Sequence, residues 1–118
     1  KLLIVEDEKI LSEMYCDTFI KQGYDVCVAP SAEEGLDAIV KELPDFILLD
    51  ILLPRSSGVE FLRELRKNSR TKNIPVLAFS NYDDPKTKEE MLRLGALDYL
   101  IKTAHTPQEL VSIVQKHL

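Results

Sequence analysis

Short apolar runs alternate along the chain with longer stretches of helical periodicity. Strands are predicted at residues 2–6, 25–29, 45–49, 74–79 and 98–101. The run at 45–49 has no alternation of apolar and polar side chains, which indicates a strand buried on both faces. Each predicted strand is followed by a predicted helix, and this rhythm favours a parallel sheet with helices on both sides.

The predicted helices begin and end at residues with known capping preferences. A helix is predicted at 9–21, and others begin after Ser31, near Gly58, after Asp83 or Asp84, and after Thr106. Ser31 with Glu34 has the spacing of a capping box, and Pro85 suits a first helical turn. The side chains expected to face the core are Ile10, Met14 and Cys16 or Asp17, then Leu36, Ile39, Val40 and Leu43, then Val59, Phe61, Leu62 and Leu65, then Met91, Leu92 and Leu94, and finally Leu110, Val111, Ile113 and Val114.

Five βα units in 118 residues predict one α/β domain with a flavodoxin-like, doubly wound sheet. Because crossover connections are right-handed, the expected strand order is 2-1-3-4-5. This order makes the first and third strands neighbours at the switch point of the sheet. Ligands bind beyond the carboxyl ends of the strands at such a point.

Composition narrows the classes of partner and compartment. The net charge of −5 disfavours nucleic acid and anionic membranes, and no apolar run approaches the roughly 20 residues of a membrane span. The basic stretch from Arg63 to Lys72 is interpreted as a solvated surface, with docking of an acidic partner as the alternative.

Cys16 and Cys27 are too few for a disulfide framework, so reduced, half-buried thiols in the cytoplasm are expected. Strand-like sequence begins at Lys1 without a signal peptide or an initiator Met, so the chain is expected to be a piece of a longer protein.

Three carboxylates follow two of the strands expected to be neighbours. Glu6 and Asp7 come after the first run, and Asp50 comes after the third. Crowded carboxylates repel one another unless a cation lies among them, and Mg²⁺ accepts such ligands together with water and phosphate oxygens. The sequence therefore predicts a Mg²⁺ site, in which an oxygen of Asp50 is placed to attack phosphorus in line. Each carboxylate taken alone has a simpler interpretation as a helix cap.

Two further polar side chains follow the fourth and fifth strands. Lys102 supplies an ammonium for a phosphoryl group, and Ser80 supplies a hydroxyl. The alternatives are a solvated lysine that protects an edge strand and a serine that begins a turn. Tyr99 is either a strand residue packed in the core or a ring whose burial changes with Ser80. His105 is interpreted as a solvated residue.

Taken in order, these residues resemble the receiver domain of bacterial two-component response regulators over all of residues 1–118. The similarity rests on Glu6, Asp7, Asp50, Pro54, Gly58, Ser80, Tyr99 and Lys102. It implies that Asp50 accepts a phosphoryl group from a phosphohistidine of a sensor histidine kinase or phosphotransfer protein. It also implies that Asp7, Asp50 and the backbone carbonyl of Leu52 hold Mg²⁺ with help from Glu6, and that Lys102 and Ser80 contact the phosphoryl oxygens.

The resemblance further implies a conformational switch rather than a turnover enzyme. Movement of Ser80 would let Tyr99 rotate inward and change the face formed by the fourth helix, fifth strand and fifth helix, which an output domain or effector would read. The added charge of about −1.5 to −2 is the physical cause of such a switch. The output, the cognate kinase and the lifetime of the phosphorylated form stay open.

The chain departs from the common family pattern at four positions. Thr103 replaces a usual proline, Asn81 replaces a small residue, Leu52 replaces a frequent Met, and Tyr82 lies two residues beyond Ser80. Asn81 is expected to narrow access to Asp50, and Tyr82 to obstruct or position an attacking water. None of the four removes a reacting group.

Three functions of other classes are weighed against the switch. A receiver-like interaction module without phosphorylation is the main alternative, but the complete acidic set argues against it. An aspartyl-phosphate hydrolase would carry a second Asp at the position of Leu52. A flavin-binding protein would carry a phosphate loop where Glu6 and Asp7 would repel a phosphate.

Overall fold

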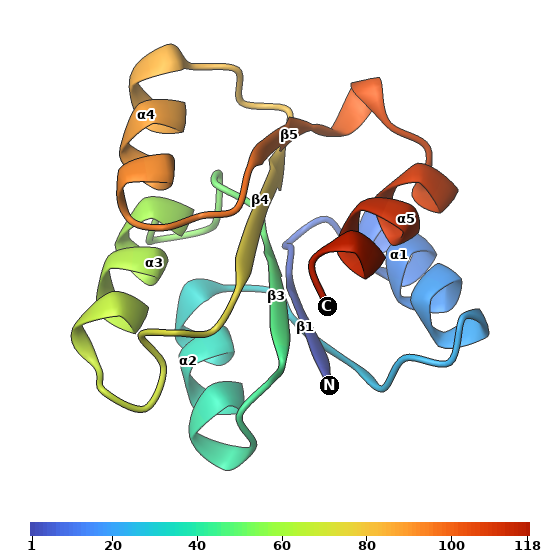
Figure 1. The fold of residues 1–118 in the computed structure, drawn as a ribbon, viewed down its shortest axis with the longest axis horizontal. Helices are drawn as coiled ribbons and strands as arrows, with labels where there is room; N and C mark the ends of the chain where they lie inside the picture. The colour runs from blue at the N-terminus through green and yellow to red at the C-terminus, as the bar shows by residue number, and fades with distance from the viewer.

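The computed structural model describes residues 1–118 and contains five strands and five α-helices in strict alternation (Figure 1). The elements are β1 (Leu2–Val5), α1 (Lys9–Lys21), β2 (Val26–Ala29), α2 (Ala32–Lys41), β3 (Phe46–Leu49), α3 (Gly58–Lys67), β4 (Val76–Ser80), α4 (Pro85–Arg93), β5 (Tyr99–Ile101), a 3₁₀ turn (Lys102–Ala104) and α5 (Pro107–Lys116). Every predicted strand and helix is therefore present.

The strands form one parallel sheet in the order β2-β1-β3-β4-β5, which confirms the flavodoxin-like, doubly wound fold. In the central pairing, Val5 lies opposite Leu49. On the β4–β5 side of the sheet, the last pair is Ser80 opposite Ile101. All five strands thus end at one edge, as the site prediction requires.

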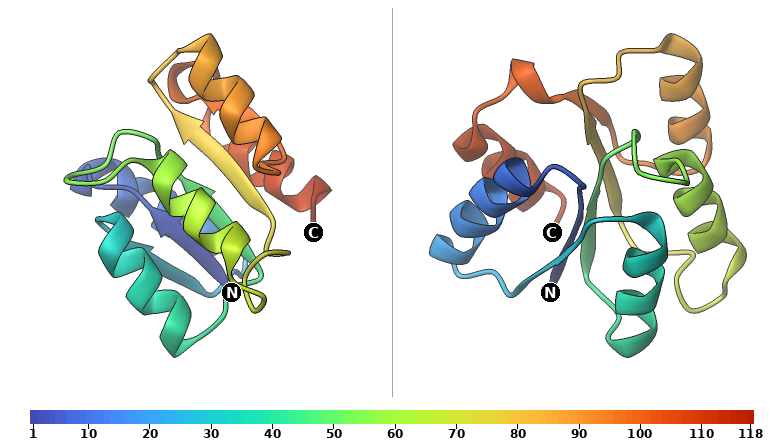
Figure 2. Two further views of the ribbon diagram at one scale, coloured as in Figure 1. Left: turned by 90° about the vertical axis from the view of Figure 1, so that its left-hand side faces the viewer. Right: turned by 180° about the vertical axis from the view of Figure 1, so that it is seen from behind.

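Helices cover both faces of the sheet and enclose two separate cores. Figure 2 shows α1 and α5 on one side and α2, α3 and α4 on the other. The larger core joins Val5, Leu49 and Ala78 to Phe61 of α3 and Met91 of α4. The smaller core comprises Leu2, Ile4, Tyr15, Phe19, Phe46, Leu48, Leu77, Phe79, Leu110, Val111 and Val114. Because central strands contribute to both cores, their apolar runs do not alternate.

The helix caps follow the sequence closely. Thr106 and Glu109 form a complete capping box at α5. Ser31 accepts a hydrogen bond from the Glu34 backbone N–H at α2, but the reciprocal bond from Glu34 is not formed. Of the two candidate caps for α4, Asp84 is the one that accepts from a backbone N–H.

The buried face of α1 differs from the prediction. Ile10 is 83% exposed and Met14 is 39% exposed, whereas Tyr15 and Phe19 are buried. Tyr15 and Phe19 are four positions apart and therefore lie on one side of the helix. The aromatic rings of Tyr15 and Phe19 bury more apolar area than the aliphatic side chains of Ile10 and Met14 would. Ser12 is also buried, and its hydroxyl donates a hydrogen bond to the Lys9 carbonyl.

Three other apolar side chains predicted to be buried are exposed: Val40, Leu43 and Leu92. Val40 and Leu92 each follow a fully packed neighbour, and one residue of helix turns a side chain by about 100° away from that face. Leu43 lies beyond the last residue of α2.

The predicted strands at 25–29, 45–49, 74–79 and 98–101 begin one or two residues too early. The Asp25 carbonyl nevertheless accepts from the Leu2 N–H over 2.8 Å, and the Asp45 N–H donates to the Lys1 carbonyl over 2.8 Å.

The basic stretch is only partly a solvated surface. Arg66 is half-buried, and its guanidinium donates to the carbonyls of Leu94, Gly95, Lys72 and Ile74. Arg66, near the end of α3, therefore binds the carbonyls at the C-terminal end of α4. The free carbonyls at a helix C-terminus favour a cation.

Candidate functional site

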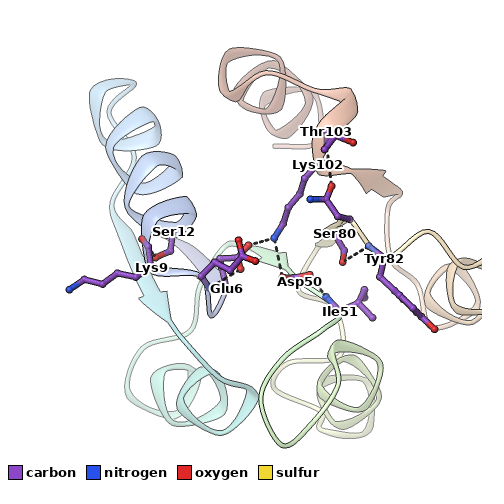
Figure 3. Close-up of polar contacts among 11 residues, drawn as sticks. Glu6, Lys9, Ser12, Asp50, Ile51, Ser80, Tyr82, Lys102 and Thr103 are labelled. Carbon is purple, nitrogen blue, oxygen red and sulfur yellow. Dashed lines mark hydrogen bonds and ion pairs between the residues drawn. The ribbon is translucent and has the colours of Figure 1, made fainter.

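The residues predicted for the site meet at the carboxyl edge of the sheet. Glu6 and Asp50 directly follow the neighbouring strands β1 and β3, and Lys102 directly follows β5. The backbone continues the ladder here, since the Asp50 N–H donates to the Val5 carbonyl over 3.0 Å. Figure 3 shows the side chains of Glu6, Asp50 and Lys102 pointing toward one another.

A cluster of three carboxylates could hold a metal ion. Glu6, Asp7 and Asp50 each present one oxygen, and these oxygens lie within 4.8 Å of one another. Glu6 and Asp50 are buried, while Asp7 is exposed and leaves the cluster open on one side. An all-oxygen donor set of this charge fits Mg²⁺, which uses few protein ligands and keeps several waters. The donor set is therefore compatible with the predicted ion.

Lys102 forms ion pairs with both buried carboxylates. Its ammonium nitrogen lies 3.0 Å from Asp50 Oδ2 and also donates to Glu6 Oε1. Only 8% of Lys102 is exposed, which excludes the interpretation of a solvated lysine. Burial alone would lower the pKa of Lys102, but the hydrogen bond to Glu6 and the charge of Asp50 outweigh it and raise that pKa.

The protonation of Glu6 depends on the same neighbours. Burial raises the pKa of Glu6 to about 7; the charge of Asp50 adds to this shift and the hydrogen bond from Lys102 opposes it. Glu6 Oε2 also accepts from the Glu8 backbone N–H over 3.1 Å. One charge from Lys102 does not balance three carboxylates, so the cluster retains a negative surplus that attracts a cation.

Asp50 is oriented by backbone groups that no pattern in the sequence indicates. The Ile51 N–H donates to Asp50 Oδ1 over 2.7 Å, which leaves Oδ2 to Lys102. Gly58 packs so closely that a Cβ there would lie 2.3 Å from the Asp50 carbonyl oxygen. Gly58 thus permits the start of α3 to approach the loop that follows β3. The only sign of this close approach in the sequence is the position of Gly58, eight residues after Asp50.

Ser80 and Tyr99 are both buried and are connected through Tyr82. Ser80 Oγ accepts from the Tyr82 backbone N–H over 3.2 Å. The Tyr99 hydroxyl donates to the Tyr82 carbonyl, and only 5% of Tyr99 is exposed. Burial, followed by the charge of Asp50, raises the pKa of Tyr99 to about 12. The phenol is therefore a hydrogen-bond donor at neutral pH.

Four other positions singled out in the sequence lie around this site. Leu52 is 59% exposed in the loop after β3, and its carbonyl accepts no hydrogen bond from the protein. Tyr82 is 39% exposed. Asn81 and Thr103 are also exposed, and a hydrogen bond joins them. His105 is half-buried and makes no side-chain hydrogen bond or ion pair, so the structure gives it no part in the site.

Comparison with known proteins identifies the family. A sequence profile described as the response regulator receiver domain matches residues 2–115. This chain belongs to the receiver domain family of response regulators. The expectations from the sequence about family and fold are thereby confirmed.

Individual relatives agree with this assignment. The Phosphate regulon transcriptional regulatory protein PhoB of Escherichia coli is 32% identical over 115 residues, which are 98% of this chain and 50% of PhoB. The chain thus spans about half the length of the curated relatives it matches.

Solved structures of receiver domains have the same fold. A putative response regulator from Chloroflexus aurantiacus is 38% identical with a TM-score of 0.88, covering 98% of this chain and 93% of that one. The chemotaxis protein CheY4 of Vibrio cholerae is 30% identical with a TM-score of 0.91, covering 99% and 97%. No helix of this receiver domain has the length and apolar character needed to cross a membrane.

Proposed function

We propose that this receiver domain is a switch activated by phosphorylation of Asp50. The observation that supports the proposal most directly is the convergence of Asp50, two further carboxylates and the Lys102 ammonium at one edge of the sheet. Asp50 Oδ2 would attack the phosphorus of a phosphohistidine. The new O–P bond forms as the N–P bond breaks, and the imidazole nitrogen keeps the electron pair.

The surrounding residues would each stabilise this transfer. Glu6, Asp7, Asp50 and the Leu52 carbonyl would hold Mg²⁺, which when bound lowers the repulsion between the incoming phosphoryl oxygens and the carboxylate. The Lys102 ammonium would move from its contact with Asp50 to a contact with a phosphoryl oxygen. The Ser80 hydroxyl would give up the hydrogen bond that it accepts from the Tyr82 N–H. It would instead donate to a second phosphoryl oxygen.

Ser80 and Tyr99 would then report the phosphorylation to the surface. Tyr99 is already buried against the Tyr82 carbonyl, and the movement of Ser80 would stabilise that arrangement relative to an outward one. The face formed by α4, β5 and α5 would change and be read by an output domain or effector. We further propose a cytoplasmic location, a histidine kinase or phosphotransfer protein as donor, and no turnover chemistry beyond the domain's own phosphorylation and dephosphorylation.

The test is phosphorylation by acetyl phosphate in the presence of Mg²⁺, followed by intact mass. Wild type is expected to gain one phosphoryl group that requires Mg²⁺, and Asp50→Asn is expected to gain none while keeping its fold. Asp45→Asn serves as the control, because Asp45 lies at the opposite end of β3 from Asp50. If neither acetyl phosphate nor any phosphohistidine donor labels wild type, the domain is an interaction module instead.

A further inference from the structure

The two loops that follow β4 and β5 are joined by one side-chain hydrogen bond. The Thr103 backbone N–H donates to Asn81 Oδ1 over 3.1 Å, and this contact is drawn at Thr103 in Figure 3. Asn81 directly follows Ser80, and Thr103 directly follows Lys102. The bond therefore connects the neighbours of two residues proposed to contact the phosphoryl group.

This bond depends on the residue types at both positions. A proline at position 103 would have no N–H to donate. A small residue such as Ala or Gly at position 81 would have no side-chain acceptor. Asn81 and Thr103, which are 22 positions apart in the sequence, thus provide the acceptor and the donor of one contact.

The local structure gives the bond a positioning effect on Lys102. Residues Lys102–Ala104 form a 3₁₀ turn, and the first N–H groups of such a turn have no partner within it. Asn81 supplies the missing acceptor for Thr103 from the neighbouring loop. The backbone at this turn also fixes where the Lys102 side chain begins its reach to Asp50 and Glu6.

We propose that Asn81 is a positioning residue, which anchors the turn after β5 through Thr103 and thereby holds the Lys102 ammonium against Asp50. The proposal rests on the proposed function, because its consequence is the rate at which Asp50 is phosphorylated. Asn81 does not touch the reacting atoms in this role. Since one neutral hydrogen bond changes an equilibrium by about tenfold at most, the effect on the rate is graded.

The test is a double-mutant cycle with a matched control. Asn81→Leu keeps the bulk of the side chain and removes the acceptor, Thr103→Pro removes the donor, and Thr103→Ala keeps the donor. Rates of Asp50 phosphorylation are measured over a range of acetyl phosphate concentrations. Each single variant is expected to lower the maximal rate by about three- to tenfold, with little change in the half-saturating concentration. The double variant is expected to match the single variants, and Thr103→Ala to match wild type.

Two results would overturn the proposal: independent, multiplying losses in the double variant, or a loss in Thr103→Ala equal to that in Thr103→Pro. A second readout separates this proposal from the proposed function. Hydrogen exchange of the Lys102 ammonium, followed by NMR without phosphorylation, is expected to quicken in Asn81→Leu and stay slow in Thr103→Ala. Unchanged exchange in Asn81→Leu would overturn the positioning role even if wild type accepts no phosphoryl group.

Discussion

Lys102 and Asp50 are 52 positions apart in the sequence, yet the ammonium of one lies 3.0 Å from a carboxylate oxygen of the other. Their side chains are only 7% and 8% exposed, and Glu6 shares the same ammonium. A buried cation between two carboxylates links the stability of the domain to its chemistry. It places a positive charge between the Glu6 and Asp50 carboxylates, and removing it leaves two buried carboxylates facing each other.

Lys102→Met is therefore expected to destabilise the metal-free domain by about 3 kcal/mol, because Glu6 and Asp50 lose their shared partner. Urea unfolding in the presence of a chelator measures this change, and added Mg²⁺ is expected to restore part of the loss. Lys9→Met is the control, because Lys9 is 87% exposed in its side chain and should stay within about 0.5 kcal/mol of wild type. Equal stability of Lys102→Met and wild type would contradict the stabilising role of the ion pair.

Gly58→Ala is expected to lower the free energy of unfolding by about 1–3 kcal/mol and to slow phosphorylation of Asp50. The added Cβ would lie 2.3 Å from the Asp50 carbonyl oxygen and 2.9 Å from the Ile51 Cα, and neither backbone atom can yield as a side chain would. Gly23→Ala is the matched control. Gly23 has a φ of +92° and no atom within 4 Å of the added Cβ, so it should lose stability through strain while the phosphorylation rate stays unchanged. Equal phosphorylation rates for both variants would contradict the close-approach argument.

Arg66→Met is expected to destabilise the domain by about 2 kcal/mol, because four backbone carbonyls lose a charged donor. Arg63→Met provides the comparison on the same helix. Arg63 pairs with Glu90, but its side chain is 43% exposed, so water replaces much of the contact and less than about 1 kcal/mol is expected. Thermal unfolding of the two variants checks the order, and a larger loss for Arg63→Met would reverse it.

Tyr99→Phe is expected to change stability at alkaline pH. The folded pKa of Tyr99 is about 12, above the ordinary value of 10, so folding favours the protonated phenol. Its contribution is complete below pH 10 and is lost as the pH rises from 10 toward 12. The free energy of unfolding should therefore fall less steeply across this interval in Tyr99→Phe than in wild type. Parallel curves for the two proteins would show that Tyr99 titrates as it does in an unfolded chain.

The fold and the acidic site were accessible from the sequence for one physical reason. Carboxyl ends of parallel strands share an edge, so polar residues placed after buried apolar runs must meet there. Glu6, Asp50 and Lys102 follow this rule, and their separation along the chain did not matter. The assignment of Ser80 and Tyr99 to switching stays a prediction, because it concerns a second conformation.

Other features depend on contacts that no periodic pattern records. The buried side of α1 was wrongly predicted because Ile10 and Phe19 are both apolar, and only packing against the sheet decides between them. The role of Arg66 depends on carbonyls from a distant helix end. The bond between Asn81 and Thr103 depends on how two loops approach each other, although each residue was recognised separately as unusual.

The contact between Glu6 and Lys102 joins positions 96 residues apart. During synthesis on the ribosome, the first carboxylates emerge long before the amine that neutralises them. A nascent chain in which β5 has not yet docked consequently lacks the cation that faces Glu6 and Asp50, however well its earlier strands have formed.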